Sequence, residues 1–372
     1  MRLLKDKFQR MIRDDSQDDD NVKKAITGAA RIYAKAASIK AGLYLRGVIR
    51  PTRLSRPVIS IGNLTVGGTG KTPAAIAVAK LLKDMGRNPA ILSRGYGGTL
   101  QKRGGMVSDG NLVMLSPGEA GDEPCLMALA LPSVPVAVGR NRAANGAFCI
   151  NKLGSDVILL DDGFQHLALY RDINIVLAGA ERPFGNGRTL PRGPLREPAC
   201  EIKRADALVL SRALPFSPAP EIWPSGRPCF RACHRPTGFL EHEFLNAPGP
   251  VSETRPMLPL SFLKGKRVAA FSGIADNAGF FDTVAELGGK IVLRRGFDDH
   301  HPYTADELKG LFADARKLGA DLVVTTEKDA VRIAEIPGGF PPLLALCVEF
   351  SFYGEALFAE WLKKSLETLE DK

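Results

Sequence analysis

Short apolar runs alternate with amphipathic stretches along most of this chain. Runs of Val, Ile and Leu typical of buried β-strands occur at 58–61, 90–92, 134–138, 157–160, 173–177 and 207–210. A Gly-rich turn and a helix over about 72–84 follow the first of them. Buried strands separated by helices predict an α/β fold with a doubly wound parallel sheet that is covered on both faces.

The second half of the chain repeats this alternation after an interruption. Residues 215–259 are rich in proline and poor in helical periodicity, which indicates a connection between domains. Strands are then expected at 268–271, 290–293, 322–325 and 343–348, and helices at 278–287, 305–318 and from 354 onward. This pattern predicts a core domain over 51–214 and a second, smaller α/β domain over 260–372.

The N-terminal segment has a different character. Residues 1–20 form a polar, acidic head that we expect to be disordered, and 21–50 follow a helical period. The apolar positions of that period are Ile26, Ala30, Tyr33, Ala37, Ala41, Tyr44 and Val48, and most of the cations fall on the other side. Such a basic amphipathic helix either lies in a membrane interface or packs its stripe onto the main domain.

Charge and composition narrow the class of partner without selecting one. The 372 residues carry a formal charge of +9, which favours nucleic acid, anionic lipid or phosphorylated substrates. The six cysteines are scattered, as expected of reduced thiols in the cytosol. We find neither a signal-peptide core nor an apolar run of about 18 residues, so we expect an intracellular protein without a transmembrane helix.

The strongest chemical signal lies between the first predicted strand and helix. Glycines in this segment allow backbone N–H groups to surround phosphate oxygens at a helix N-terminus, as in a P-loop. Lys71 should reach the β- and γ-phosphates, and the Thr72 hydroxyl should ligate Mg²⁺. Thr65 replaces the glycine that commonly opens this pattern. The residues expected to bind ATP are Thr65, Val66, Gly67, Gly68, Thr69, Gly70, Lys71 and Thr72.

Two carboxylates follow the predicted strand at 157–160. Asp161 and Asp162 stand where a P-loop protein holds Mg²⁺, directly or through water, although a single strand-terminal Asp can also be a helix cap or turn former. Arg196 lies in a proline-rich basic loop that suits phosphate binding, with a solvated loop as the alternative.

Two further groups of residues leave their roles open. Asp122 precedes an apolar helix, where a carboxylate is most often an N-cap. His300 lies among two aspartates and a second histidine, which indicates a metal site, a carboxylate-supported base or a plain surface turn.

Taken together, these segments resemble the tetraacyldisaccharide 4′-kinase family of lipid A biosynthesis. The motifs run in order from about 55 to 330, so the resemblance covers most of the chain. They are the Gly62–Pro73 loop, Ser93-Arg94-Gly95-Tyr96-Gly97, Gly121-Asp122-Glu123-Pro124, Asp161-Asp162-Gly163-Phe164-Gln165-His166, Gly193-Pro194-Leu195-Arg196-Glu197, Asp299-His300 and Thr325-Thr326-Glu327-Lys328-Asp329.

The resemblance implies transfer of the ATP γ-phosphate to the 4′ hydroxyl of an acylated glucosamine disaccharide 1-phosphate. It implies Asp122 as the base and His300 as its partner from the second domain, so that domain closure would assemble the site. Thr72, Asp161 and Asp162 would manage Mg²⁺, with Asp162 also counted as catalytic. Arg196 and Glu197 would contact nucleotide phosphate or metal.

The resemblance also bears on location and partners. It implies a peripheral protein on the cytoplasmic face of the bacterial inner membrane, held there by the 21–50 helix. No nucleic acid and no protein partner is implied. The rivals are a soluble P-loop kinase for a small metabolite, a nucleotide-switch ATPase or GTPase and a nucleic-acid-binding ATPase. The sequence lacks an Asn-Lys-x-Asp guanine-reading motif and an aromatic-basic stacking module.

Overall fold

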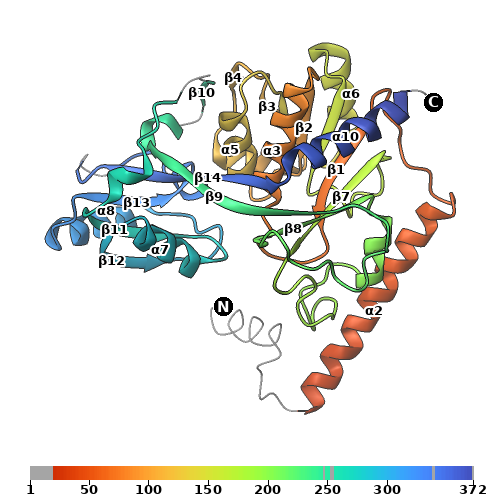
Figure 1. Cartoon of the computed structure of the whole chain (residues 1–372), viewed down its shortest axis with the longest axis horizontal. Helices are drawn as coiled ribbons and strands as arrows, with labels where there is room; N and C mark the ends of the chain where they lie inside the picture. Colours follow the sequence, from red (N-terminus) through yellow and green to blue (C-terminus); the bar gives the residue numbers. More distant parts are fainter. Residues whose placement is uncertain (1–19, 246–247, 252–254, 337–339, 371–372) are drawn as a thin grey trace. The chain divides into compact units, whose positions relative to one another are not determined.

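A computed structural model describes residues 20–245, 248–251, 255–336 and 340–370 (Figure 1). The chain is a mixed α/β protein whose strands pair mainly in parallel, as predicted. It divides into two compact units. The first comprises Met1–Ala75, Asp156–Cys233 and Ser351–Lys372, and the second comprises Ile76–Ser155 and His234–Phe350. The acidic head expected over 1–20 lies outside the described residues except for its last residue.

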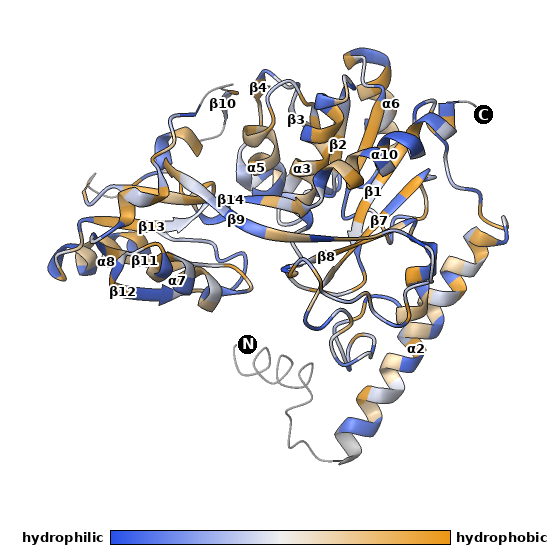
Figure 2. Ribbon diagram, in the orientation of Figure 1, coloured by the Kyte–Doolittle hydropathy of each residue, from blue (hydrophilic) through white to orange (hydrophobic). Residues whose placement is uncertain are grey.

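Five parallel strands form the centre of the first unit, in the order β6-β1-β7-β8-β9. β1 and β7 are mainly apolar (Figure 2) and almost fully buried, as expected of strands covered on both faces, and their buried polar residues are Ser60, Asn63 and Asn174. The elements of this unit are α2 Asp20–Leu45, β1 Val58–Asn63, β6 Val157–Asp161, β7 Ile173–Gly179, the 3₁₀ helix η2 Ala199–Arg204, β8 Ala207–Ser211 and α10 Glu355–Glu370.

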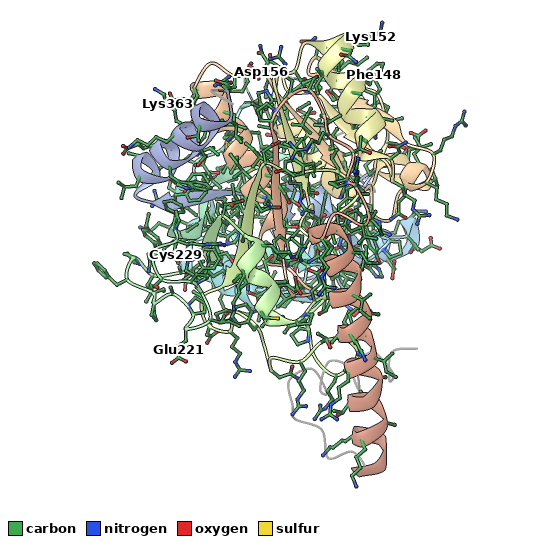
Figure 3. All side chains as sticks on the ribbon, turned by 90° about the vertical axis from the view of Figure 1, so that its right-hand side faces the viewer. Phe148, Lys152, Asp156, Glu221, Cys229 and Lys363 are labelled. Carbon is green, nitrogen blue, oxygen red and sulfur yellow. The ribbon has the colours of Figure 1, made fainter. Side chains whose placement is uncertain are left out.

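The second unit contains two groups of strands. β2 and β5 pair in parallel, β3 pairs antiparallel with both β5 and β4, and β4 pairs antiparallel with β10. The elements of this group are β2 Pro89–Ser93, η1 Thr99–Gln101, β3 Gly105–Ser108, β4 Leu112–Val113, α4 Pro117–Ala120, α5 Asp122–Ala130, β5 Val136–Val138, α6 Arg142–Leu153, η3 His242–Leu245 and β10 Gly249–Pro250. On α6, Phe148 and Lys152 point outward (Figure 3), while Cys149 is buried.

The other group of strands in the second unit is wholly parallel, in the order β14-β13-β11-β12. Its elements are η4 Leu260–Leu263, β11 Arg267–Ser272, α7 Asn277–Glu286, β12 Lys290–Gly296, α8 Ala305–Lys317, β13 Leu322–Thr326 and α9 Glu327–Ala330. Thr304 and Glu307 form a capping box at the start of α8, which satisfies two backbone N–H groups that the helix leaves without partners.

The contact-based units do not follow the domain boundaries expected from the sequence. Residues 76–155 group with the C-terminal half of the chain, and α10 groups with the first unit. The predicted connection contains a long strand, β9 Cys229–Glu241. The chain changes units within β9, within α3 Lys71–Asp84 and within β14 Leu343–Tyr353, and of these three elements β9 lies in the expected proline-rich connection.

The apolar stripe expected on the N-terminal helix is covered only in part, because Tyr33 is 40% exposed and Val48, beyond the end of α2, is 69% exposed. Ala30 and Ala41 are buried, and the carbonyl of Ala30 accepts a hydrogen bond from the Thr189 hydroxyl at 2.9 Å. The exposed apolar side chains include Ile32 and Ile39, seven residues apart on the opposite face. Part of the predicted stripe, at Ala30 and Ala41, is therefore buried, while other positions of the stripe stay exposed. No helix among the described residues is long and apolar enough to cross a membrane.

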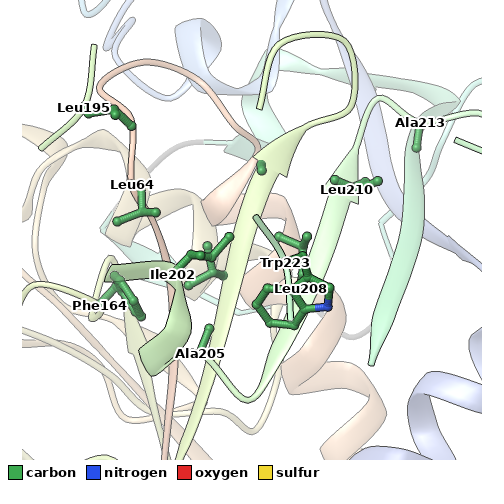
Figure 4. Close-up of a cluster of buried hydrophobic side chains, with 11 residues drawn as sticks. Leu64, Phe164, Leu195, Ile202, Ala205, Leu208, Leu210, Ala213 and Trp223 are labelled. Atoms are coloured by element: carbon green, nitrogen blue, oxygen red, sulfur yellow. The ribbon is translucent and has the colours of Figure 1, made fainter. Parts of the chain in front are cut away.

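An apolar cluster anchors the loops that follow β1 and β6. Leu64 lies directly after β1 and Phe164 lies three residues after β6, and both are buried against β8 residues such as Leu208 and Leu210 (Figure 4). A Cβ on Gly62 would lie 2.6 Å from Phe164 Cβ, which explains the glycine there. The core thus fixes the two segments that carry the predicted phosphate and metal residues.

Candidate active site

The first unit holds the predicted phosphate loop between β1 and α3. Gly67 and Gly70 have φ values of 113° and 80°, a backbone region that favours glycine. The side chain of Asn63 donates a hydrogen bond to the Thr69 hydroxyl at 2.8 Å. The Gln165 side chain donates to the Asn63 carbonyl at 2.9 Å. The loop is therefore held at both ends by side chains from within the same unit.

The basic loop lies directly alongside the phosphate loop. Thr65 and Leu195 form an antiparallel bridge, the Val66 N–H donates to the Pro194 carbonyl at 2.8 Å, and the Arg196 N–H donates to the Leu64 carbonyl at 2.7 Å. This pairing fixes the position of Arg196 next to the residues predicted to bind ATP. The sequence placed these two segments about 125 residues apart without showing that they pair.

Lys71, Asp162 and Arg196 come together at this loop. Arg196 donates to both carboxylate oxygens of Asp162, at 2.8 and 2.7 Å, and Lys71 Nζ lies 4.0 Å from Asp162 Oδ1. The neighbouring Asp161 ends β6, which pairs with β1, so the carboxyl ends of both strands meet at the loop. Residues that the sequence analysis assigned separately to phosphate and to metal therefore lie together in the structure.

The donor set at this edge fits a magnesium–nucleotide complex. Asp161 and Asp162 offer carboxylates, and Thr72 offers a hydroxyl in the first turn of α3. Mg²⁺ in such sites is held by one or two carboxylates and by substrate phosphates, not by a closed cage of protein ligands. The described residues contain no group of three or more His, Cys, Asp or Glu side chains placed to hold a metal.

Glu197 has a different environment from the other predicted metal residues. Its buried carboxylate accepts a hydrogen bond from Arg204, whose guanidinium also lies over the Phe164 ring at 4.4 Å. Burial raises the pKa of Glu197, and the Arg204 charge opposes that shift. Arg204 occupies Oε2 of Glu197, so a metal role would fall to Oε1 or would require Glu197 to leave Arg204.

The second unit contains the other predicted site, centred on Asp122 and His300. Asp122 is the first residue of α5, and its Oδ2 lies 3.1 Å from His300 Nδ1. The sequence assigned these residues to different domains that close on each other. In the structure both belong to the second unit, so the pair forms without any movement between units.

Cations surround this pair. Arg332 contacts Asp122 Oδ2 through Nε at 2.9 Å and Nη2 at 2.7 Å. Lys328 Nζ lies 3.1 Å from His300 Nε2 and 3.0 Å from Glu123 Oε1. Burial raises the pKa of Asp122, but His300, Arg332 and Lys328 together outweigh it and hold the pKa well below its usual range.

The hydrogen bonds define the tautomer of His300. An ammonium group can only donate, so Nε2 of His300 must accept the bond from Lys328. The proton of the neutral ring therefore lies on Nδ1 and is donated to Asp122. This arrangement can accept a proton at Nε2 while the carboxylate stabilises the resulting imidazolium. Tyr96 lies edge-on to the same ring, with centroids 5.8 Å apart.

Sequence reasoning missed the contribution of Arg332. Lys328 lay within a motif noted in the sequence, but Arg332 lies beyond its end and follows no recognisable pattern. It reaches the site because α9 ends at Ala330 and the chain continues in a helical turn, with the Arg332 N–H donating to the Asp329 carbonyl. Only the three-dimensional contact identifies it.

The backbone before Asp122 imposes a strict requirement for glycine. Gly121 has φ 93°, and a Cβ there would lie 2.6 Å from the Tyr96 carbonyl oxygen. We expect Gly121→Ala to lower the free energy of unfolding by about 1–3 kcal/mol and to displace Asp122. The measurement is chemical denaturation beside Gly118→Ala, whose nearest neighbour is 4.0 Å away. Equal stabilities of the two variants would contradict this account.

Comparisons with known proteins match this chain to a single family. A protein-family model described as "Tetraacyldisaccharide-1-P 4'-kinase" matches residues 22–367. A protein from Desulfatibacillum aliphaticivorans named tetraacyldisaccharide 4′-kinase is 41% identical over 99% of both chains. A protein of the same name from Geobacter metallireducens is 42% identical over 91% of this chain and 95% of its own.

A solved structure supports the same relationship at the level of the fold. The chain is similar to LpxK from Aquifex aeolicus, described as an "apo" form in complex with ATP. The two share 33% sequence identity with a TM-score of 0.75, covering 93% of this chain and 99% of the other.

Proposed function

This chain belongs to the tetraacyldisaccharide-1-P 4′-kinase family, and on that premise we propose that it transfers the γ-phosphate of ATP to the 4′ hydroxyl of an acylated glucosamine disaccharide 1-phosphate. The reaction is a step of lipid A biosynthesis. One observation carries the proposal to this chain's own residues. A His–carboxylate pair at 3.1 Å occurs in the same chain as a phosphate loop with its strand-end carboxylates.

We assign the residues of the first unit to the P-loop fold and to ATP. The loop from Thr65 to Thr72 surrounds the phosphates, and Lys71 binds their γ end. Arg196 binds phosphate oxygens, for which it must exchange its bond to Asp162. Mg²⁺ bound with ATP would neutralise phosphate charge, held by Thr72, Asp161 and Asp162, with Glu197 as a further ligand through Oε1 or after it leaves Arg204.

In the second unit, the Asp122–His300 pair accepts the proton of the attacking hydroxyl. A sugar hydroxyl is a weak nucleophile and needs a positioned base during transfer. The surrounding cations hold the pKa of Asp122 well below its usual range, so the proton finishes on the imidazole and Asp122 stabilises it. Lys328 can release His300 Nε2 because Glu123 and Asp299 remain as partners, at 3.0 and 3.5 Å.

The dependence of ADP release on the added acceptor tests this proposal. We expect ATP turnover to rise steeply when acylated disaccharide 1-phosphate is added in detergent micelles. Glucosamine 1-phosphate, a small soluble acceptor, should produce no rise. A rise with the small acceptor alone would favour the rival reading of a soluble metabolite kinase. Equal turnover with and without any acceptor would favour a nucleotide switch.

The outer face of α2 supports contact with the cytoplasmic face of the inner membrane. Ile32 and Ile39 are 73% and 54% exposed on one side of the helix. Exposed Arg31, Lys35 and Lys40 flank them, so that apolar groups can enter the acyl boundary while cations meet lipid phosphates. The membrane-facing residues are thus different from those of the stripe expected from the sequence.

Introducing negative charge on this face should detach the protein from membranes. We expect the double variant Ile32→Glu/Ile39→Glu to bind anionic phospholipid vesicles about tenfold more weakly or worse, because two apolar anchors are replaced by anions. Vesicle sedimentation measures this. The matched control is Leu357→Glu, which changes a 66% exposed apolar side chain on α10. Equal binding by both variants would remove α2 as the membrane contact.

A further inference from the structure

A buried network behind Asp122 connects it to the interior of the second unit. Arg332 joins two carboxylates: its Nε and Nη2 contact Asp122 Oδ2, and its Nη1 donates to Asp329 Oδ1 at 3.2 Å. The Asp329 side chain is fully buried and that of Arg332 is only 10% exposed. The guanidinium is therefore held between the candidate site and a carboxylate with no access to solvent.

Asp329 is itself fixed from several directions. Its Oδ1 accepts hydrogen bonds from the Gly273 N–H at 3.0 Å and from the Tyr303 hydroxyl at 2.9 Å. Its Oδ2 accepts from the Thr326 hydroxyl at 2.6 Å. A buried carboxylate with this many donors has one orientation only. It gives the planar guanidinium of Arg332 a fixed direction, which a flexible ammonium would not have.

We propose that Arg332 is a positioning residue for phosphoryl transfer. Asp329 anchors the Arg332 guanidinium, and the guanidinium holds the Asp122 carboxylate in the orientation that receives His300 Nδ1–H. The inference rests on the function proposed above and extends it to a residue that does not touch the reacting atoms. Arg332 acts through Asp122. Without it, the Asp122 side chain can rotate away from His300, and the imidazole loses the bond that defines its tautomer.

The test compares Arg332→Gln, Arg332→Lys and the control Arg295→Gln. Arg295 forms an exposed ion pair with Asp314 at 3.1 Å on the same unit, away from the network. We expect Arg332→Gln to lower kcat about 10²-fold with KM for ATP changed less than about threefold. Arg332→Lys keeps the charge but cannot bind both carboxylates, so we expect a loss of about tenfold. Arg295→Gln should retain wild-type kinetics.

The pH profile separates positioning from a general loss of folded protein. The groups that act on Asp122 are Arg332, His300 and Lys328, with Glu123 and Cys125 on its own helix. Removing Arg332 removes a cation that contacts the Asp122 carboxylate, so the coupled Asp122–His300 pair takes up a proton at higher pH. The acid limb of kcat/KM should therefore move to higher pH in Arg332→Gln and stay in place in Arg332→Lys.

A double-mutant comparison gives a second criterion. In an Asp122→Asn background, Arg332→Gln should cause no further loss, because it acts only through the carboxylate. Nitrogen-15 NMR of the histidines needs no turnover: wild type should hold the His300 proton on Nδ1, and Arg332→Gln should show both tautomers. If the wild type transfers no phosphate, the proposed function fails, but the NMR comparison still tests the role of Arg332.

Three results would overturn the inference while leaving the proposed function intact. The first is kinetics and a pH profile of Arg332→Gln equal to those of Arg295→Gln. The second is an additional loss in the Asp122→Asn background. The third is unfolding of both Arg332 variants while Arg295→Gln folds, which would make Arg332 a structural residue.

Discussion

Lys71→Met lowers phosphate transfer about 10²–10³-fold or more while the protein remains folded. Lys71 begins α3 and its Nζ lies 4.0 Å from Asp162 Oδ1, at the strand end assigned to the phosphates. Removing one preorganised donor from a transferring group typically costs this much, since charge on the γ-phosphate loses its compensation. Steady-state transfer with saturating ATP measures the change.

Lys80→Met is the matched control for this variant. Lys80 lies on the same helix and forms an exposed ion pair with Glu349 at 3.6 Å, where a lost charge contributes little. It should retain nearly full activity. Activity of Lys71→Met within about threefold of this control would remove the phosphate role of the 65–72 loop.

The second large effect is expected at the His–carboxylate pair. His300→Ala and Asp122→Asn should each lower kcat about 10²–10⁴-fold, because either change removes the positioned proton acceptor. The two residues act as a unit, so kcat of the double variant should be close to kcat of the less active single variant. Single-turnover transfer with bound ATP separates this loss of chemistry from a loss of binding.

His301→Ala is the neighbouring control. Its ring stacks on Phe297 and lies edge-on to Tyr303, with centroids 4.6 and 5.1 Å apart, and its Nε2 pairs with the exposed Glu307 at 3.2 Å. We expect most of the activity to remain. If instead His301→Ala loses as much activity as His300→Ala, these histidines maintain the local structure and the His300 imidazole has no specific role in catalysis.

The strands and the phosphate loop could be predicted because local sequence determines them. The β1 and β7 runs are buried on both faces and remain mainly apolar despite Ser60 and Asn174, and glycine is required where φ is positive in the loop. Asp161 and Asp162 follow from the same pattern. The short antiparallel strands β3 and β4 were missed, because four and two residues leave little periodicity to detect.

What could not be predicted depends on contacts between distant segments. Ala30 and Ala41 belong to the predicted stripe, but the stripe gives no signal of its partner, the loop whose Thr189 hydroxyl donates to the Ala30 carbonyl. Arg332 meets Asp122 across 210 residues of sequence. The grouping of 76–155 with the C-terminal half is likewise a tertiary outcome, and it unites Asp122 with His300 in one unit.

The central claim is that this chain phosphorylates the 4′ hydroxyl of an acylated disaccharide. The most direct measurement follows γ-labelled phosphate from ATP into purified tetraacyldisaccharide 1-phosphate in detergent micelles, with the labelled position then assigned by NMR. We predict magnesium-dependent label at the 4′ oxygen, absent with Lys71→Met and strongly reduced with His300→Ala. Bound ATP with no label in the lipid, or label at another hydroxyl, would contradict the account.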